Sequence, residues 1–337
     1  ERAARLGHAP GHFVSGVAPG YALGKVTVQR NAGGDVERTW ERQSPSAMMA
    51  EEILREWIEG LCDSVALAPA IPGPIVSDID LLAVYPLGDP HFGMLSWAKE
   101  TGENFDLEIA HQLTTAAIDR LVSSSPAAHT GMLLNLGDLF HADDSTNRTR
   151  NSGAQLDVDG RFPRIAVVAL DAMVHCINRL REKHARVIVR NNRGNHDPHQ
   201  AFMLSVALNA HFRNDPRVEI DMSPASFYYY RFGKVLIGST HGDGAKLDQL
   251  PSIMADDMPE DWGATRYRAW HCGHFHHDQA KEYRGVTVET HRTLAAKDSW
   301  HTHMGYRSGR DMKAIIYHRE FGEITRIRCG IQMLEAA

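Results

Sequence analysis

The sequence predicts an α/β fold with a largely parallel or mixed sheet, because three observations agree. Five short runs rich in branched and aromatic residues have the length and composition of buried strands: residues 79–85, 131–136, 185–190, 234–238 and 268–272. Helical patterns lie between several of these runs, over residues 106–122, 163–183 and 199–212. Strands that alternate with helices are typical of α/β folds.

A short motif of Asp, Asn or His residues accompanies the end of each predicted strand. In chain order the motifs are Asp89-Pro90-His91, Gly137-Asp138, Gly194-Asn195-His196-Asp197, His241-Gly242 and Gly273-His274-Phe275-His276. In open α/β sheets, ligands bind beyond the carboxyl ends of the strands. We therefore expect these motifs, which are distant in sequence, to meet in one site.

The residue types in these motifs indicate a site for two metal ions. Two carboxylates, one amide oxygen and several imidazoles suit Mn, Fe, Zn, Co or Ni better than Ca or Mg, which prefer oxygen ligands. The formal charge of such a site is about +1, from two divalent cations, the carboxylates of Asp89 and Asp138 and a bridging hydroxide. A net positive charge favours the binding of a phosphate anion. Two metals roughly 3.5–4 Å apart can activate water and stabilise an in-line displacement.

The ordered set of motifs resembles the calcineurin-like metallophosphoesterase superfamily, over about residues 79–277. The resemblance implies a fold of two facing mixed β-sheets flanked by helices. It also implies a ligand set: Asp89, His91 and His276 on the first metal, Asn195, His241 and His274 on the second, and Asp138 bridging both. His196 matches the family's catalytic histidine, which stabilises the transition state or protonates the leaving group. Asp197 would orient its imidazole.

Each motif alone also has a purely structural interpretation. Asp-x-His is usually a surface turn, Gly-Asp is a common turn dipeptide, and Gly-Asn-His-Asp is compatible with an Asx turn. All five motifs in family order make a chance match a poor explanation. A non-catalytic scaffold of the same family is a further alternative. It is disfavoured because every ligand position holds a competent residue.

The residues after Asp138 favour one branch of the superfamily. Protein Ser/Thr phosphatases usually continue Gly-Asp with two residues and then Asp-Arg-Gly, and this chain does not. Gly-Asp-Leu-Phe-His instead resembles DNA repair nucleases and related phosphodiesterases, which implies that His141 reaches the substrate phosphate. Alternatively, His141 packs or hydrogen-bonds at the strand end. A weaker resemblance is to phage-encoded members.

Composition excludes some classes of function. Of 337 residues, 43% are hydrophobic and 23% are charged, as in ordinary globular proteins. No apolar run approaches the roughly 18 residues of a membrane span, and no apolar signal core opens the chain. Four unpatterned cysteines indicate reduced thiols and a cytoplasmic protein. A formal charge of −6 counts against a sequence-independent grip on long duplexes, although metals can supply positive charge locally.

Two polar stretches lie where they can flank the predicted site. The first carries Arg148, Arg150, Arg161 and Arg164, and a solvated loop explains it best. The second, residues 293–310, is predicted to form a loop or short helix over the catalytic mouth. Basic residues in and just before this segment are interleaved with aromatic residues: Arg292, Lys297, Trp300, Tyr306, Arg307 and Arg310. Binding of a nucleotide or a single strand requires this combination of positive charge and stacking. A solvated loop is an equal alternative. Its His301 and His303 are expected to be ordinary surface histidines, with contact to the substrate as the alternative.

The remaining segments predict an N-terminal annex and a completed sheet. Residues 23–29 and 36–41 alternate around a Gly-rich turn and predict a hairpin. A helix is predicted after Ser44 and Pro45, and Pro69, Pro72 and Pro74 mark a linker. We therefore expect an annex over residues 1–76, which permits a homodimer contact, and a catalytic domain over residues 77–337. Residues 285–289, 312–318 and 323–328 are predicted to be further strands.

Together these observations predict a two-metal-dependent phosphodiester hydrolase, a nuclease or a nucleotide phosphodiesterase, that uses a metal-activated hydroxide. Mn is the favoured metal, with Fe, Zn, Co or Ni as alternatives. The expected substrates are nucleic acid ends, single strands or cyclic nucleotides. The alternatives are a phosphomonoesterase acting on nucleotides or small metabolites, and a metal-bound interaction scaffold with little turnover.

Overall fold

The computed structural model describes residues 21–45, 66–149 and 153–334. The chain divides into two compact units, Glu1–Val65 and Ala66–Ala337. The helix predicted after Ser44 and Pro45 lies outside the described residues. Within the described residues, no helix is both long and apolar enough to span a membrane.

The described part of the first unit is the predicted hairpin. Strands β1 (Tyr21–Arg30) and β2 (Val36–Pro45) pair antiparallel, with Thr27 opposite Trp40. The turn between them closes on Asn31, whose side-chain oxygen accepts hydrogen bonds from the backbone N–H groups of Gly33 and Asp35. Asn can satisfy a tight turn in this way because its short side chain reaches the backbone two residues on.

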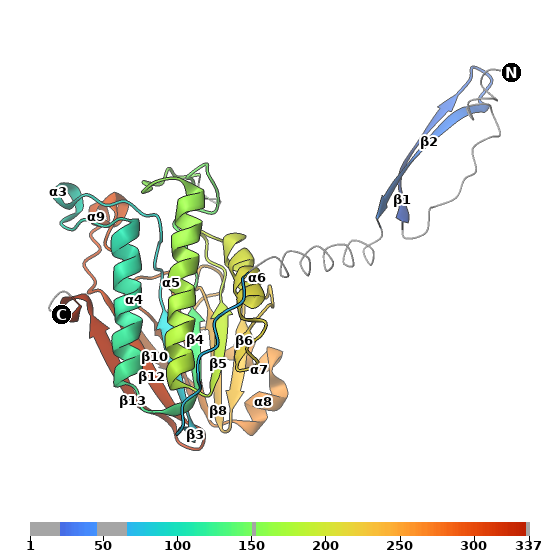
Figure 1. Cartoon of the computed structure of the whole chain (residues 1–337). Helices are drawn as coiled ribbons and strands as arrows, with labels where there is room; N and C mark the ends of the chain where they lie inside the picture. The colour runs from blue at the N-terminus through green and yellow to red at the C-terminus, as the bar shows by residue number, and fades with distance from the viewer. Residues whose placement is uncertain (1–20, 46–65, 150–152, 335–337) are drawn as a thin grey trace. The chain divides into compact units, whose positions relative to one another are not determined.

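The second unit contains two mixed β-sheets (Figure 1). The first sheet has the strand order β13-β12-β3-β4-β5-β6: Gly322–Gly330, Asp311–His318, Asp78–Leu87, Ala128–Asn135, Arg186–Asn191 and Val218–Ile220. The second has the order β10-β11-β9-β8-β7: Gln279–Tyr283, Val286–Thr290, Tyr267–Cys272, Val235–Thr240 and Tyr228–Phe232. Strands β3, β4, β5 and β6 run parallel, as do β8, β9 and β11.

Three hydrophobic clusters hold this unit together in layers. Side chains such as Val84, Leu134 and Ile237 fill the space between the two sheets. The other face of the first sheet packs on the helices α4 (Leu107–Ser124), α5 (Phe162–Lys183) and α6 (Gln200–Phe212). The far face of the second sheet is covered by α7 (Leu250–Asp257) and α8 (Pro259–Ala264). The predicted fold class, two facing mixed sheets flanked by helices, is confirmed.

Local sequence explains where several of these elements begin and end. The Asp106 side chain accepts a hydrogen bond from the Ile109 N–H and so caps α4, and a proline stands in the first turn of α5. The short helix α9 (Ser299–His303) is likewise capped at its N-terminus by Asp298. The short helix α3 (Ala98–Thr101) ends at Gly102. A 3₁₀ turn, Ile331–Met333, ends the described chain.

The proline-rich segment is attached to the larger unit by hydrogen bonds. The Ala68 N–H donates to the backbone oxygen of His211, Arg181 donates to the oxygen of Pro69, and Arg217 donates to the oxygen of Ile71. The compact units divide between Val65 and Ala66, and a folding boundary near residue 76 stays a prediction.

Candidate metal centre

The predicted ligand motifs follow strands whose carboxyl ends share one edge of the fold. Asp89 follows β3, Asp138 follows β4 and Asn195 follows β5, three parallel neighbours in the first sheet. His241 follows β8 and His274 follows β9, which are parallel neighbours in the second sheet. The two sheets pack face to face, so both sets of loops project toward the same region.

The backbone at the predicted ligands is held in an uncommon conformation. The φ angles of five of them are positive: 45° at Asp89, 49° at His91, 51° at Asp138, 66° at His274 and 53° at His276. Such angles cost free energy in residues other than glycine and persist where the surrounding structure imposes them. Elsewhere in the described chain, Asn147 and Arg284 are the other non-glycine residues with positive φ. Strain is thus concentrated at the predicted ligands.

One group of potential metal ligands consists of Asp89, His91 and His276. One ligand atom from each lies within 4.8 Å of the other two. The Nε2 atoms of His91 and His276 are 3.2 Å apart, and His276 Nε2 is 3.5 Å from Asp89 Oδ1. Two imidazole nitrogens and a carboxylate oxygen that converge in this way have the arrangement of a metal-binding set.

A second group consists of Asp138, His241 and His274, again with ligand atoms within 4.8 Å of one another. His241 Nδ1 donates to the backbone oxygen of Leu136 at 2.9 Å, which leaves Nε2 as the ligand atom. That Nε2 is 3.2 Å from Asp138 Oδ2 and 2.9 Å from Asn195 Oδ1. The structure therefore brings the predicted ligands of the second metal together.

The two groups are adjacent, and His241 is the residue that links them. Its Nδ1 atom is 3.8 Å from Asp89 Oδ1, while its Nε2 atom contacts Asp138 of its own group. Asp89 in turn accepts a hydrogen bond from the backbone N–H of His274 at 2.9 Å. Whether one carboxylate bridges two metals, as predicted for Asp138, stays a prediction.

Two glycines in the motifs make room for the carboxylates. A Cβ atom at Gly194 would collide with Asp138 Oδ1, and one at Gly273 would lie 2.7 Å from Asp89 Oδ2. Any larger residue would therefore displace a ligand. The glycines of Gly-Asn-His-Asp and Gly-His-Phe-His thus have a steric function, which the sequence alone did not reveal.

The four proposed imidazole ligands divide into two kinds, because the pKa is lowered at His91 and His274 and raised at His241 and His276. Burial opposes ionisation of Asp138, but His241 outweighs it, and the carboxyl pKa lies well below its usual range. Burial lowers the pKa of His91 and of His274, so both imidazoles are neutral and can donate a lone pair. Burial also opposes the charged form of His241, yet Asp138 and Asp89 raise its pKa to about 10. In the metal-free protein a proton on His241 therefore occupies the region between the carboxylates, where a metal would add positive charge. The residues present fit two transition-metal ions.

His196, the predicted catalytic residue, lies beside these groups. Its ring centroid is 5.0 Å from that of His91. The His196 N–H donates to Asp138 Oδ1 at 2.8 Å, which ties its backbone to the centre. Its Nδ1 atom donates to the backbone oxygen of His141 at 2.8 Å.

The predicted orientation of the His196 imidazole by Asp197 stays a prediction, because the hydrogen bond from the His196 ring goes to the backbone oxygen of His141. The Asp197 carboxylate instead accepts hydrogen bonds from the backbone N–H groups of Gly194, Asp138 and Phe140, at 2.9, 3.2 and 3.1 Å. Asp197 therefore joins two ligand loops. Burial, followed by the charge of Asp138, raises its pKa to about 7.

His141 is brought to the centre as predicted, but in a buried position. It is 2% exposed, its Nδ1 atom is 3.3 Å from His91 Nδ1, and its ring stacks on His196 with centroids 5.3 Å apart. Burial, and then the neighbouring His196, lower its pKa to about 3. The neutral ring can orient His91 through this nitrogen pair. Contact with a substrate phosphate stays a prediction.

Two residues near the centre were not assigned there from sequence. Thr293 donates from its hydroxyl to the backbone oxygen of Asp89 at 2.6 Å and so supports the strained loop. His301, expected to be a surface histidine, stacks on His276 with ring centroids 4.8 Å apart and an interplanar angle of 16°. Local sequence around His301 resembles an ordinary polar loop, and tertiary packing alone reveals the contact.

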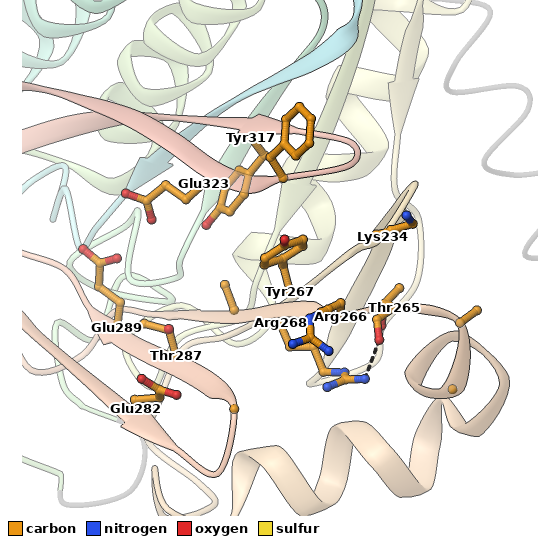
Figure 2. A pocket seen from close by; sticks show the side chains of 15 residues that line it. Lys234, Thr265, Arg266, Tyr267, Arg268, Glu282, Thr287, Glu289, Tyr317 and Glu323 are labelled. Atoms are coloured by element: carbon orange, nitrogen blue, oxygen red, sulfur yellow. Dashed lines mark hydrogen bonds between the residues drawn. The ribbon is translucent and has the colours of Figure 1, made fainter.

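A cavity of about 900 Å³, drawn in Figure 2, has a lining that includes none of the predicted ligands. It is lined by residues at the first positions of β9 and β11 and around the β12–β13 turn, among them Tyr267, Thr287 and Phe321. The ligand motifs follow the last residues of β9, so at roughly 3.3 Å per residue the cavity and the centre are about a strand length apart. The candidate centre is therefore identified by the chemistry of its ligands and not by this cavity.

Comparisons with known proteins do not identify the residues of this centre. No model of a known protein family matches the sequence. No curated protein matches it either. Solved structures do match, with low scores. One is an uncharacterized protein of Streptococcus pneumoniae TIGR4 described as a predicted phosphoesterase, with 10% identity, TM-score 0.31, and coverage of 75% of this chain and 99% of that one.

Two further structures match in the same way. A novel archaeal phosphodiesterase has 15% identity and a TM-score of 0.36, with coverage of 73% of this chain and 99% of that one. Vps29 of Entamoeba histolytica in complex with zinc has 12% identity and a TM-score of 0.29, with coverage of 74% and 98%. Because these scores are low, the assignment of the fold rests on the strand order and layers, and the assignment of the centre on its residues.

Proposed function

We propose that the protein is a metal-dependent phosphodiester hydrolase, acting on nucleic acid strands or on small nucleotides. The observation that carries the proposal is the pair of adjacent ligand groups, each with one buried carboxylate and two imidazoles, at the carboxyl ends of strands from two packed sheets. Structural histidines rarely converge in this way, because burying many polar groups costs free energy unless a ligand satisfies them.

We assign Asp89, His91 and His276 to one metal and Asn195, His241 and His274 to the other, with Asp138 between them. The contacts of His241 with Asp138 and Asn195 support the second set. Bound divalent metals would supply Lewis acidity toward phosphate oxygens and toward water. The mixed nitrogen and oxygen ligands favour Mn, Fe, Zn, Co or Ni.

His196 is the residue that we assign to proton transfer. Because its Nδ1–H is held by the backbone oxygen of His141, Nε2 is the atom left to exchange a proton with a leaving oxygen. The hydrogen bond from its backbone N–H to Asp138 keeps the ring at a fixed distance from the ligand groups. Asp197 supports the centre indirectly, because its carboxylate fixes the backbone of the loops that carry Asp138 and Gly194.

The preference for diesters rests on His141. A phosphodiester presents one negative charge fewer than a monoester, and a neutral donor can hydrogen-bond it without requiring a second cation. His141 is neutral at pH 7 and belongs to a group of three histidines with His91 and His196. These properties support the phosphodiesterase assignment over the phosphomonoesterase alternative.

The first experiment compares two chromogenic substrates. Protein stripped with chelator and reloaded with Mn²⁺ is assayed on bis-p-nitrophenyl phosphate and on p-nitrophenyl phosphate. We expect faster turnover of the diester. Faster turnover of the monoester would favour the phosphomonoesterase, and no turnover with both metals bound would favour the scaffold.

A substitution at His196 tests the mechanism. Loss of a general acid typically costs about 10²–10⁴-fold in rate, so His196→Ala should lose activity to that extent while metal content stays nearly unchanged. His111→Ala is the matched control, because His111 pairs with Asp171 on the helical layer rather than at the centre. Full activity in His196→Ala would refute the assignment.

A further inference from the structure

The segment that follows β11 brings a chain of aromatic rings to the candidate centre. His301 of α9 stacks on the proposed ligand His276. Beyond it, the ring centroids of His301 and Tyr306 are 5.1 Å apart, and those of Tyr306 and Trp300 are 5.8 Å apart with an interplanar angle of 36°. The rings thus lead outward from the metal ligands to the surface.

Local hydrogen bonds hold this segment in place. The Asp298 side chain accepts from both the backbone N–H and Nδ1 of His301, each at 2.7 Å, and caps α9. The Tyr306 N–H donates to the backbone oxygen of His301 at 3.0 Å. The rings are therefore arranged before any ligand arrives, which lowers the entropy cost of binding.

The outer rings are exposed although they are large. Trp300 is 55% exposed and Tyr306 is 37% exposed. Exposure of a single aromatic residue is common, but two adjacent rings joined to a catalytic centre form an apolar surface that a flat ligand can cover. The ring contacts of Trp300 and Tyr306 within the described chain are with His301 and with each other.

Positive charge accompanies these rings. Among the described residues Lys297 forms no ion pair with a carboxylate, and Arg307 donates to the backbone oxygens of Thr302 and Tyr306. Within the part of the chain that the structure describes, neither cation pairs with a carboxylate. Aromatic rings with free cations are the combination by which proteins bind single-stranded nucleic acid, since every base has a face to stack and every linkage carries negative charge.

We propose that Trp300 and Tyr306 form a base-stacking shelf, which positions the nucleobase next to the scissile linkage and selects single-stranded nucleic acid as substrate. This inference rests on the proposed function, since it names the substrate class of the same site. The geometry favours a single strand over a duplex, whose bases are already stacked on each other and cannot cover a protein ring.

The test measures binding rather than turnover. The Mn²⁺-loaded protein is titrated into a short fluorescein-labelled oligothymidylate with phosphorothioate linkages, which resist cleavage, and into the same backbone with abasic sites in place of the bases. Fluorescence anisotropy gives the two dissociation constants. We expect the wild type to bind the intact strand on the order of 10-fold more tightly, as one stacked base typically contributes.

Substitutions then locate the effect. Trp300→Ala should bind both strands with similar affinity, while Trp300→Phe, which keeps a ring, should retain most of the preference. Phe321→Ala is the matched control, because Phe321 is an exposed aromatic residue, 66% exposed, beside the cavity at the other end of the strands. It should behave like the wild type.

The outcomes separate this inference from the proposed function. Equal affinity of the wild type for the two strands, no measurable binding of either, or an equal loss of preference in Phe321→Ala would overturn the shelf. Hydrolysis of bis-p-nitrophenyl phosphate together with equal affinities would overturn the shelf and leave the phosphodiesterase assignment standing. A base preference without any hydrolysis would support the shelf and refute the hydrolase.

Discussion

Two buried clusters in the larger unit both contain carboxylates and histidines, but the negative charge is balanced differently in each. The candidate centre contains Asp89, Asp138 and five histidines or amides that the structure gathers around them. A second cluster, between the two sheets, contains His271, Glu289 and His291 within the same 4.8 Å limit. By ligand type alone, both are metal sites.

The second cluster already holds a cation of its own. Lys313 Nζ is 2.6 Å from Glu289 Oε1 and 2.6 Å from Asp278 Oδ1, and Arg326 adds a contact with Glu289 at 3.0 Å. Burial keeps the pKa of His271 near 4 and that of His291 near 3, so the imidazoles are neutral at pH 7. The charge of Glu289 is therefore balanced by Lys313 and Arg326.

The candidate centre is balanced by a proton on His241 instead, because Asp138 and Asp89 raise the pKa of that imidazole to about 10. Within the described residues, Asp89 and Asp138 form ion pairs with histidines rather than with lysine or arginine. A buried charge must be paired or bound to a metal. The comparison teaches that the kind of cation, more than the presence of histidines, distinguishes the two clusters. Lys313 and Arg326 are permanent cations, whereas a metal can displace the proton on His241.

Asp138→Asn gives the largest expected effect. An amide keeps the shape of the side chain but removes one negative charge from the centre, so at least one metal should be lost. Since metals contribute several kcal/mol to transition-state stabilisation, diester hydrolysis should fall by roughly 10³-fold or more. Metal content and turnover measured on the same sample check this, and two bound metals with full activity would refute the assignment of Asp138.

Lys313→Met tests the other half of the comparison. Removal of Lys313 leaves buried Glu289 with Arg326 as its remaining cation, so the free energy of unfolding should fall, by at most the roughly 3–5 kcal/mol of a fully broken buried pair. Glu289 is 2% exposed, which makes this penalty applicable. Denaturant unfolding measures the loss, with Lys281→Met on the exposed strand β10 as the control. A variant as stable as the control would show that Lys313 does not balance this cluster.

Proton release on metal loading is a smaller effect with a defined sign. The pKa of His241 is raised to about 10, so the metal-free protein carries this proton at pH 7 and the metal must displace it. Calorimetry of Mn²⁺ binding in buffers of different ionisation enthalpy should reveal proton release, at least one proton of which comes from His241. Metal affinity should rise with pH up to about pH 10, where the released proton vanishes.

The same shift affects the stability of the metal-free protein. A raised folded-state pKa stabilises the fold fully below the ordinary value of about 6.5, and that contribution is lost as the pH rises through about 10. Unfolding of chelated protein should therefore become easier between pH 6.5 and 10. An affinity and a stability that do not change over this range would contradict the protonated state of His241.

Much of the fold was predictable because it follows from local patterns. Short buried runs gave the strands β3, β4, β5, β8 and β9, and helical spacing gave α4, α5 and α6. The elements that were not predicted have weaker patterns. Strand β10, whose side chains are mostly exposed, and helix α8, which has no buried residue, lack the apolar periodicity on which such predictions depend.

The sequence by itself determined the candidate metal ligands, because the motifs lie at strand ends and parallel strands end at a common edge. It did not determine which other residues contact those ligands or balance the charge of the second cluster. The tertiary structure decided that Asp197 holds loop N–H groups, that His301 stacks on His276, and that Lys313 fills the second cluster. These contacts join segments far apart in the chain, so their energies depend on packing between layers, which no local pattern encodes.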